Sequence, residues 1–285
     1  MNKTITISEG LDVTKFMRIR KYDLDELKAS NVILQKKKTK FTKYMFRYKW
    51  FKKLYFYLYF KITGKIKGSS YPEDISKSDE TNIQNIFDKL KSKYPNELYY
   101  LTEKMEGQSA TYEYRNCVKK WYSFNVKNTF KVYSHNIQKN IDDNSNWWKI
   151  AKNEQIEEKM SKVPYNVAVQ GEIVGKGIQK DIYQFGGLRF FVFRVKNLST
   201  GKYLEYKELK KFCKEYEFEM VPVIDENKKL LSNIKEILED SNGITIFNKV
   251  NKNQLKEGIV WRSQSNQNVG FKAKSPKYLQ WWDKK

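Results

Sequence analysis

Three short segments, far apart in the chain, carry side chains that could act on a phosphate ester. The first is EKMEG at 103–107, with Lys104 as its basic residue; the second, EGIVWR, begins at Glu257, and the third, FKAKS, contains Lys272 and Lys274. An uncharged lysine amine is a nucleophile, carboxylates bind divalent metal ions, and further lysines can contact phosphate oxygens. Together these groups could attack the α-phosphate of a nucleotide.

This chemistry explains why these residue types are needed. The attacking amine must be neutral, yet a free lysine with a pKa near 10.4 is neutral in only about one molecule in a few thousand at pH 7, which costs roughly 4.6 kcal/mol. Lys272 and Lys274, two residues apart on an expected strand, would share one face, contact one phosphate and disfavour protonation of Lys104. A hard ion such as Mg2+ would neutralise the phosphates, and Glu172 and Glu257 are the candidates to hold it.

The order of the motifs is more informative than any single one. A KxEG string occurs by chance in many lysine-rich proteins, and GEIVG, FFVFRV and EGIVWR would also suit ordinary strands. Here the lysine is followed by VYSHN at 132–136, VQGEIVGKGIQ at 169–179, FFVFRV at 190–195, EGIVWR and FKAK. A series of strands would explain the apolar residues. It would not explain why acids, an aromatic residue and lysines follow one another in this order along the chain.

The series resembles the motifs of the ATP-dependent RNA ligases, in the branch of the covalent nucleotidyltransferase superfamily that joins RNA 3'-hydroxyl and 5'-phosphate ends. The resemblance runs from about Gly10 to Leu279. It implies ATP as a substrate, Mg2+ or Mn2+ as the metal ion, and nicked or broken RNA as the partner. The reaction would pass through a lysyl-AMP and an RNA-adenylate, in RNA repair.

The resemblance also implies a role for each matching residue. Lys104 would take the adenylate, Phe193 would stack on the adenine, and Glu103 would help to read it. Glu172 would lie near the ribose and a metal-bound water. The full set is catalytic Lys104, Glu257, Lys272 and Lys274, nucleotide-binding Glu103, Glu106, Glu172 and Phe193, and metal-binding Glu172 and Glu257.

Three positions depart from the family pattern. Glu106 stands where the family often has Asp or His, His135 in VYSHN stands where Arg is usual, and Asn82 in SKSDETNIQN stands where Arg is normal. The first two departures leave room for a different protein, an RNA-binding protein that keeps the ligase fold without turnover.

A DNA ligase or a capping-type transferase is the other alternative. Those enzymes place Arg five residues after the nucleophile, where this chain has Ser109. They also continue into an oligonucleotide-binding barrel, whereas this chain ends eleven residues beyond Lys274. Both features favour the RNA ligases.

The chain is strongly basic, with 55 Lys and Arg against 33 Asp and Glu and a net charge of +22 over 285 residues. Such a charge attracts polyanions, RNA among them, and makes binding salt-dependent. Only 7 of the 55 basic residues are Arg, a bias that an AT-rich genome would also produce. The length suits one large domain, or one domain with an appendage.

The charge is concentrated at the start. Residues 1–70 hold 18 basic and 5 acidic residues, a net of +13, and Gly64 to Pro72 suggests a boundary. We therefore expect a basic N-terminal appendage at 1–70 and a nucleotidyltransferase domain at 71–285. Within 41–60, eleven of twenty residues are aromatic; a helix packed on the domain, an RNA-stacking surface and a membrane-interface helix are all consistent with this segment.

Other protein classes are disfavoured. Cys117 and Cys213 form no CxxC pair, so free thiols are expected. No signal peptide is visible, the apolar run 54–60 is too short to span a bilayer, and no P-loop motif is present. We expect a monomer without stable membrane association, in the cytoplasm, or in the host cytoplasm if the source is viral.

The mixture of strand and helix patterns predicts an α+β fold, and the resemblance implies antiparallel sheets flanked by helices around an ATP cleft. One helix is expected to begin near Ser78 or Asp79 and to bury Ile83, Ile86, Phe87 and Leu90. Pro222 should mark an edge or the end of a strand. Strands are expected at 98–101, 110–114, 130–133, 167–174, 189–195, 258–262 and 269–274, and further helices at 147–160, 205–216 and 230–240.

Overall fold

The computed structural model describes Tyr48, Trp50 and residues 71–116, 128–140, 144–248 and 252–283. Almost all of the appendage predicted for 1–70, and the predicted free thiol of Cys117, therefore lie outside the described residues. Cys213 is described, and it is a free, buried thiol as predicted. Among the described residues, no helix has both the length and the apolar character needed to cross a membrane.

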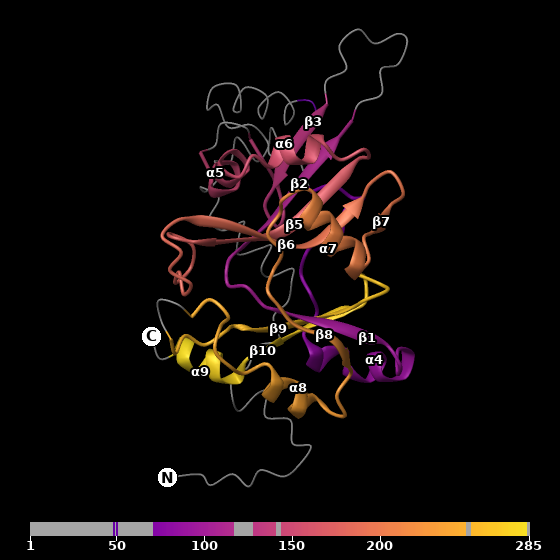
Figure 1. Cartoon of the computed structure of the whole chain (residues 1–285), viewed down its shortest axis with the longest axis vertical. Helices are drawn as coiled ribbons and strands as arrows, with labels where there is room; N and C mark the ends of the chain where they lie inside the picture. The colour runs from indigo at the N-terminus through magenta and orange to yellow at the C-terminus, as the bar shows by residue number, and fades with distance from the viewer. Residues whose placement is uncertain are drawn as a thin grey trace. The chain divides into compact units, whose positions relative to one another are not determined.

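The larger sheet has six strands in the order β4-β3-β2-β5-β6-β7, and each neighbouring pair is antiparallel (Figure 1). Strands β5 and β6 pair over nine positions, and most of their residues are buried. The bounds are β2 Gln108–Arg115, β3 Thr129–Tyr133, β4 Gln138–Lys139, β5 Val167–Gly175, β6 Leu188–Asn197 and β7 Lys202–Tyr203.

The smaller sheet has four antiparallel strands in the order β10-β9-β1-β8. Its strands are β1 Leu98–Glu103, β8 Val223–Lys229, β9 Gly258–Ser263 and β10 Gly270–Lys274. Pro222 directly precedes β8, an edge strand, which confirms the predicted position of this proline. The chain passes from one sheet to the other between β1 and β2, and this crossing contains Lys104.

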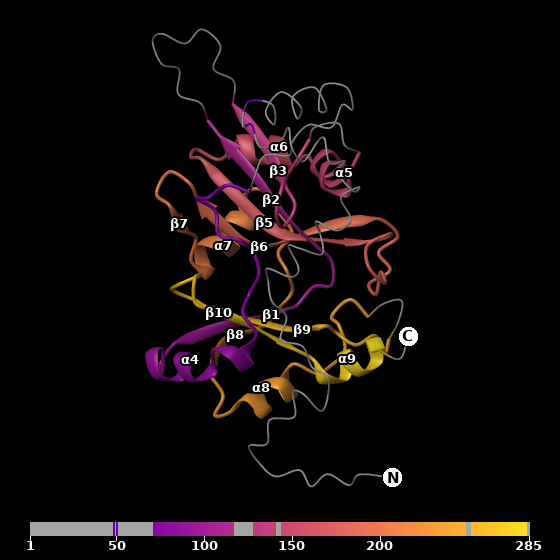
Figure 2. The same cartoon turned by 180° about the vertical axis from the view of Figure 1, so that it is seen from behind.

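Helices cover each sheet, as Figures 1 and 2 show. The six-stranded sheet packs against α5, α6 and α7 in one apolar core, and the four-stranded sheet packs against α4 and α8 in a second. The bounds are η1 Ile83–Asn85, α4 Phe87–Lys93, α5 Asn146–Asn153, α6 Ile156–Ser161, α7 Tyr206–Glu215, α8 Ile234–Asp240 and α9 Pro276–Asp283.

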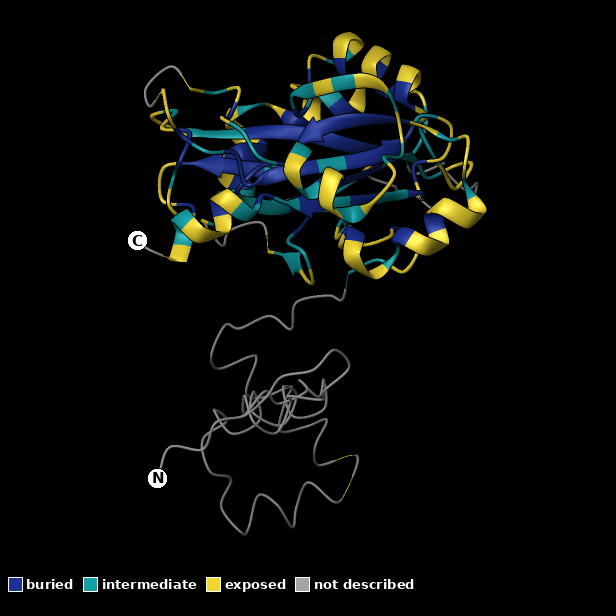
Figure 3. Ribbon diagram, turned by 90° about the horizontal axis from the view of Figure 1, so that it is seen from below, coloured by how far each residue is buried: buried dark blue, intermediate teal, exposed yellow. Residues whose placement is uncertain are grey.

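A third apolar cluster contains residues of the crossing segment, the six-stranded sheet and α9. It contains Met105 from the crossing, Phe191 and Phe193 from β6, Val221, and Tyr278 from α9. Figure 3 shows the buried strands inside this domain and the exposed helical surfaces around them. The antiparallel sheets and flanking helices confirm the predicted α+β fold.

Some predicted boundaries are wrong. No helix begins at Ser78 or Asp79: the first turn is η1, and α4 follows at Phe87. Ile83, Phe87 and Leu90 are buried as predicted, whereas Ile86 is only partly buried. The helix predicted at 147–160 is two helices, because Gln155 adopts a left-handed φ of 53° between them. The helix predicted at 230–240 begins only at Ile234.

Candidate active site

Lys104 directly follows β1, whose side chains after Leu98 are all buried. Its backbone N–H donates to the carbonyl of Gly258 at 3.0 Å, which joins the crossing segment to the start of β9. Its Nζ lies 2.6 Å from Oε2 of Glu257, and the two side chains are 21% and 12% exposed. The predicted nucleophile and one predicted acid are therefore in direct contact.

Glu257 also contacts Lys274. Its Oε1 lies 3.8 Å from the Lys274 Nζ, so one carboxylate lies between two cations. The β9–β10 register pairs Lys274 with Gly258, and Gly258 has a φ of +156°. A Cβ on Gly258 would lie 2.2 Å from the Ala273 carbonyl oxygen, so a glycine after Glu257 is needed for this close strand pairing.

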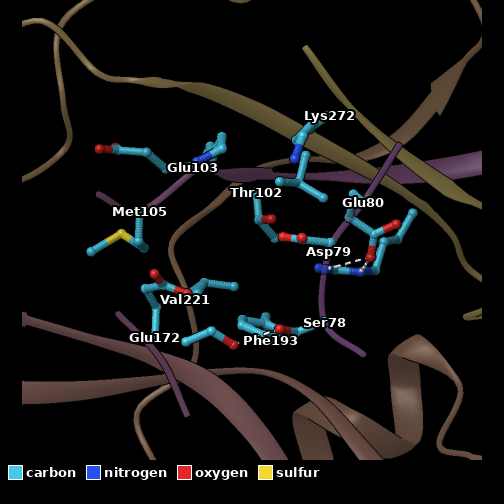
Figure 4. A pocket seen from close by; sticks show the side chains of 14 residues that line it. Ser78, Asp79, Glu80, Thr102, Glu103, Met105, Glu172, Phe193, Val221 and Lys272 are labelled. Atoms are coloured by element: carbon cyan, nitrogen blue, oxygen red, sulfur yellow. Dashed lines mark hydrogen bonds and ion pairs between the residues drawn. The ribbon is translucent and has the colours of Figure 1, made fainter. Parts of the chain in front are cut away.

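A pocket between the two sheets opens beside Lys104. The four-stranded sheet contributes Glu103 and Lys272, and the six-stranded sheet contributes Glu172 and Phe193. Figure 4 shows Lys272 on one side, Glu172 and Phe193 on the other, and the segment with Asp79 between them. Five predicted residues thus line one pocket, while Glu106, Glu257 and Lys274 lie outside its lining.

The alternation in β10 places both predicted phosphate-facing lysines on one face. Phe271 and Ala273 are buried, whereas Lys272 and Lys274 are partly exposed. Among the described residues, Lys272 forms no ion pair. The pocket therefore contains a cation that is available to an anionic ligand.

Glu172 of β5 lies in the pocket as a partly exposed acid. Burial raises the pKa of its carboxyl to about 8; the positive charge of Lys104 lowers it, and the negative charges of Glu257 and Asp79 raise it. A group in this setting binds a proton, a cation or a hydrogen-bond donor more readily than an exposed glutamate does.

Glu103 and Glu106, on either side of the nucleophile, make different contacts. The buried Glu103 carboxylate accepts hydrogen bonds from Thr245 Oγ1 at 2.5 Å and from the Ile246 N–H at 2.9 Å. Glu106, 4% exposed, accepts from the Tyr278 hydroxyl at 2.5 Å. The nucleotide-binding roles of both acids remain predictions.

Several residues of the pocket were not predicted. Arg262 of β9 is 2% exposed and donates from Nε and Nη2 to Oε1 of Glu80, at 3.1 and 2.9 Å. Its guanidinium lies 5.1 Å from the centre of the Phe193 ring, which fixes one side of the predicted base-stacking residue. Arg262 belongs to the quoted EGIVWR motif, but no sequence signal pairs it with an acid 182 residues earlier.

The segment 78–80 enters the pocket where a helix start was predicted. The Ser78 and Ser109 hydroxyls are 2.5 Å apart, and Asp79 is 3.3 Å from Nε2 of His135. His135 therefore contacts a pocket residue from the turn that follows β3. Ser109 is the position at which DNA ligases and capping enzymes carry Arg, and here it contacts another serine.

A divalent metal ion would need partners beyond the protein. In the described part of the chain, no three His, Cys, Asp or Glu residues are placed to hold one. Mg2+ commonly binds one or two carboxylates together with waters and substrate phosphates. Glu172 and Glu257 fit that pattern, because their charges act on each other and both act beside Lys104.

Solved structures of an RNA ligase share this fold. A Naegleria gruberi RNA ligase solved with PPi has a TM-score of 0.65 and 24% identity, over 78% of this chain and 61% of that chain. A mutant of that enzyme with ATP and Mn gives a TM-score of 0.66 at 24% identity, over 78% and 62%. Another mutant, with AMP and Mn, gives 0.65 at 24%, again over 78% and 62%. The chain thus shares their fold and spans about three fifths of their length.

Curated proteins gave no match to the chain. The model of the RNA ligase family, in contrast, matches residues 97–278. This stretch is more than half of the 285 residues and runs from the strand before Lys104 into the helix after Lys274. The chain therefore belongs to the RNA ligase family.

Proposed function

We propose that the chain is an ATP-dependent RNA ligase that joins a 3'-hydroxyl to a 5'-phosphate in RNA repair. The main support is the position of the Lys104 amine, 2.6 Å from Glu257 and beside a pocket with Glu172, Phe193 and Lys272. The pocket offers an aromatic face, an acid and a cation. These are suitable partners for a nucleobase, a ribose hydroxyl and a phosphate.

In the first step, the Lys104 amine attacks the α-phosphorus of ATP. A nitrogen–phosphorus bond forms, the bond from that phosphorus to the bridging oxygen breaks, and pyrophosphate leaves. The amine must give up its proton, and Glu257 is an acceptor within hydrogen-bond reach. Lys272 and Lys274 stabilise the negative charge that develops on the α-phosphate oxygens.

The next two steps transfer AMP and close the RNA. An oxygen of the RNA 5'-phosphate attacks the AMP phosphorus, the bond to Lys104 breaks, and the amine regains a proton. The RNA 3'-hydroxyl then attacks the activated 5'-phosphate, a phosphodiester bond forms, and AMP leaves. Adenine would lie against Phe193, with Glu172 near the ribose.

The predicted metal site fits this scheme. When bound, Mg2+ or Mn2+ would neutralise the triphosphate and help pyrophosphate to leave. Glu172 and Glu257 would hold it together with phosphate oxygens. The ion would then bind far more tightly in the presence of nucleotide than in its absence.

Protein mass after incubation with ATP and Mg2+ tests the proposal. The wild-type chain should gain the mass of one AMP on the peptide that contains Lys104. Lys104→Ala should gain none, and Lys207→Ala, at an exposed lysine of α7, should behave as wild type. Lys272→Ala and Lys274→Ala should slow the gain, and a wild-type chain that gains no AMP would favour a non-catalytic RNA-binding protein.

Substrate choice needs separate measurements. Nicks in all-RNA, all-DNA and mixed duplexes, each with ATP or GTP, should show sealing of RNA ends with ATP. Preferential sealing of DNA nicks, or labelling by GTP, would instead indicate a DNA ligase or a capping-type enzyme. The monomeric state, the cytoplasmic location and the two-domain division at residue 70 remain proposals.

A further inference from the structure

Glu106 is held on three sides although it lies in a short crossing segment. Its Oε2 accepts from the Tyr278 hydroxyl at 2.5 Å, and its Oε1 accepts from the Lys180 N–H at 3.3 Å. Its own backbone N–H donates to the Tyr183 hydroxyl at 2.8 Å. The residue two positions after the nucleophile is therefore tied to α9 and to the loop that follows β5.

The start of α9 is tied to the opposite side of the site. Ser275, which directly follows Lys274, caps the helix: its Oγ accepts from the Tyr278 N–H at 3.1 Å. The Ser275 N–H donates to the carbonyl of Glu257 at 2.9 Å. A continuous series of hydrogen bonds therefore connects Glu106, through Tyr278 and the first turn of α9, to Glu257. Glu257 is the ion-pair partner of Lys104.

The other end of α9 holds the same loop. The Lys180 Nζ lies 3.7 Å from the centre of the Trp282 ring and donates to the Trp282 carbonyl at 3.1 Å. The Tyr278 ring is 5.4 Å from that of Trp281 and 5.7 Å from that of Trp282. These contacts restrict the Tyr278 hydroxyl to its position against Glu106.

We propose that Tyr278 is a positioning residue: its hydrogen bond to Glu106 holds the segment after Lys104 so that the amine faces Glu257. This hydrogen bond requires the side-chain length of a glutamate at position 106. An aspartate would end about 1.5 Å short, so the longer acid is the one that reaches α9. Of the two measurements below, only the rate of AMP transfer rests on the proposed function.

Four substitutions separate positioning from general stability. Tyr278→Phe removes only the hydroxyl, and Glu106→Met keeps the length but removes both acceptors. Glu106→Gln keeps an oxygen that can accept from Tyr278. Tyr112→Phe is the matched control. It removes a buried hydroxyl of the six-stranded sheet that donates a hydrogen bond to the Trp147 carbonyl at 3.0 Å.

The first readout does not need catalysis. Brief acetylation followed by peptide mass spectrometry should show Lys104 labelled severalfold faster in Tyr278→Phe and Glu106→Met than in wild type, because the amine leaves Glu257. Glu106→Gln and Tyr112→Phe should label like wild type, and the exposed Lys207 is an internal reference in every variant. Unchanged Lys104 labelling in folded Tyr278→Phe would overturn the proposal.

The second readout is the rate of AMP transfer to Lys104. A hydrogen bond to a charged group is typically strong enough for its loss to slow this step on the order of tenfold. The double variant Tyr278→Phe with Glu106→Met should be no slower than the slower single variant, because both break one path. Fully additive losses would refute the coupling, while absence of AMP transfer in wild type would refute the proposed function and leave the acetylation result valid.

Discussion

Replacement of Glu172 by glutamine should make the protein more stable at alkaline pH. The glutamate carboxyl titrates near 4.5 when unfolded, and burial raises its folded pKa to about 8. Below both values the folded and unfolded states both hold the proton, so the group does not affect stability. Above both values the folded state bears a charge whose burial Lys104 offsets only in part, so this penalty appears as the pH rises from 4.5 to 8.

The size of the effect follows from these two pKa values. Their difference corresponds to an upper limit of about 5 kcal/mol, at about 1.4 kcal/mol for each tenfold change in proton affinity. Glu172 is only partly covered, so solvent screening reduces this value. We expect Glu172→Gln to gain about 2 to 3 kcal/mol in unfolding free energy near pH 8.5, and little near pH 5.

Urea denaturation in EDTA, at both pH values, measures the difference. The exposed Glu73 supplies the control, because Glu73→Gln should leave the pH dependence of stability as in wild type. Glu172→Gln should also lose most AMP transfer, so that stability and function move in opposite directions. Equal effects of Glu172→Gln at the two pH values would refute the assigned burial of this charge.

Three further outcomes follow from other parts of the structure. Gly107→Ala would place a Cβ 2.3 Å from a backbone carbonyl of β5; it should lower the melting temperature and AMP transfer, whereas Gly187→Ala, with nothing within 4 Å, should do neither. Arg262→Ala leaves the Glu80 carboxylate, 14% exposed, without its ion-pair partner, and should cost about 3 kcal/mol in urea denaturation. Deletion of residues 1–70 should reduce nick sealing far more than AMP transfer in gel assays, and equal losses would indicate a folding role for the appendage.

The sequence predicted the strands that build the site, because each has an apolar pattern of its own. β1, β5, β6, β9 and β10 lie close to their predicted ranges. β8 was not predicted, since its sequence VIDENKK is polar and becomes a strand only by pairing with β1. Helix α9 was also missed, although it carries Tyr278.

Charged contacts across the fold were the least predictable part. The Lys104–Glu257 pair joins two residues that the motifs already singled out, so their proximity was expected. The Glu80–Arg262 pair joins residues 182 positions apart, and the acid lies in a segment predicted to begin a helix. The local sequence pattern carries no information on such a partner. The position of Glu80 depends on how the segment before η1 meets β10, where the Lys272 N–H donates to the carbonyl of Thr81.

The division of the site between the two sheets suggests how its parts can work separately. Lys104, Glu257 and Lys274 all belong to the four-stranded sheet or its ends, so their ion pairs persist if the sheets move apart slightly. The nucleotide pocket also needs Glu172 and Phe193 from the six-stranded sheet, so its width depends on that movement. Because the nucleophile lies in the crossing between the sheets, the proposed role of the Tyr278–Glu106 hydrogen bond is to hold this crossing and, with it, the direction of the amine toward Glu257.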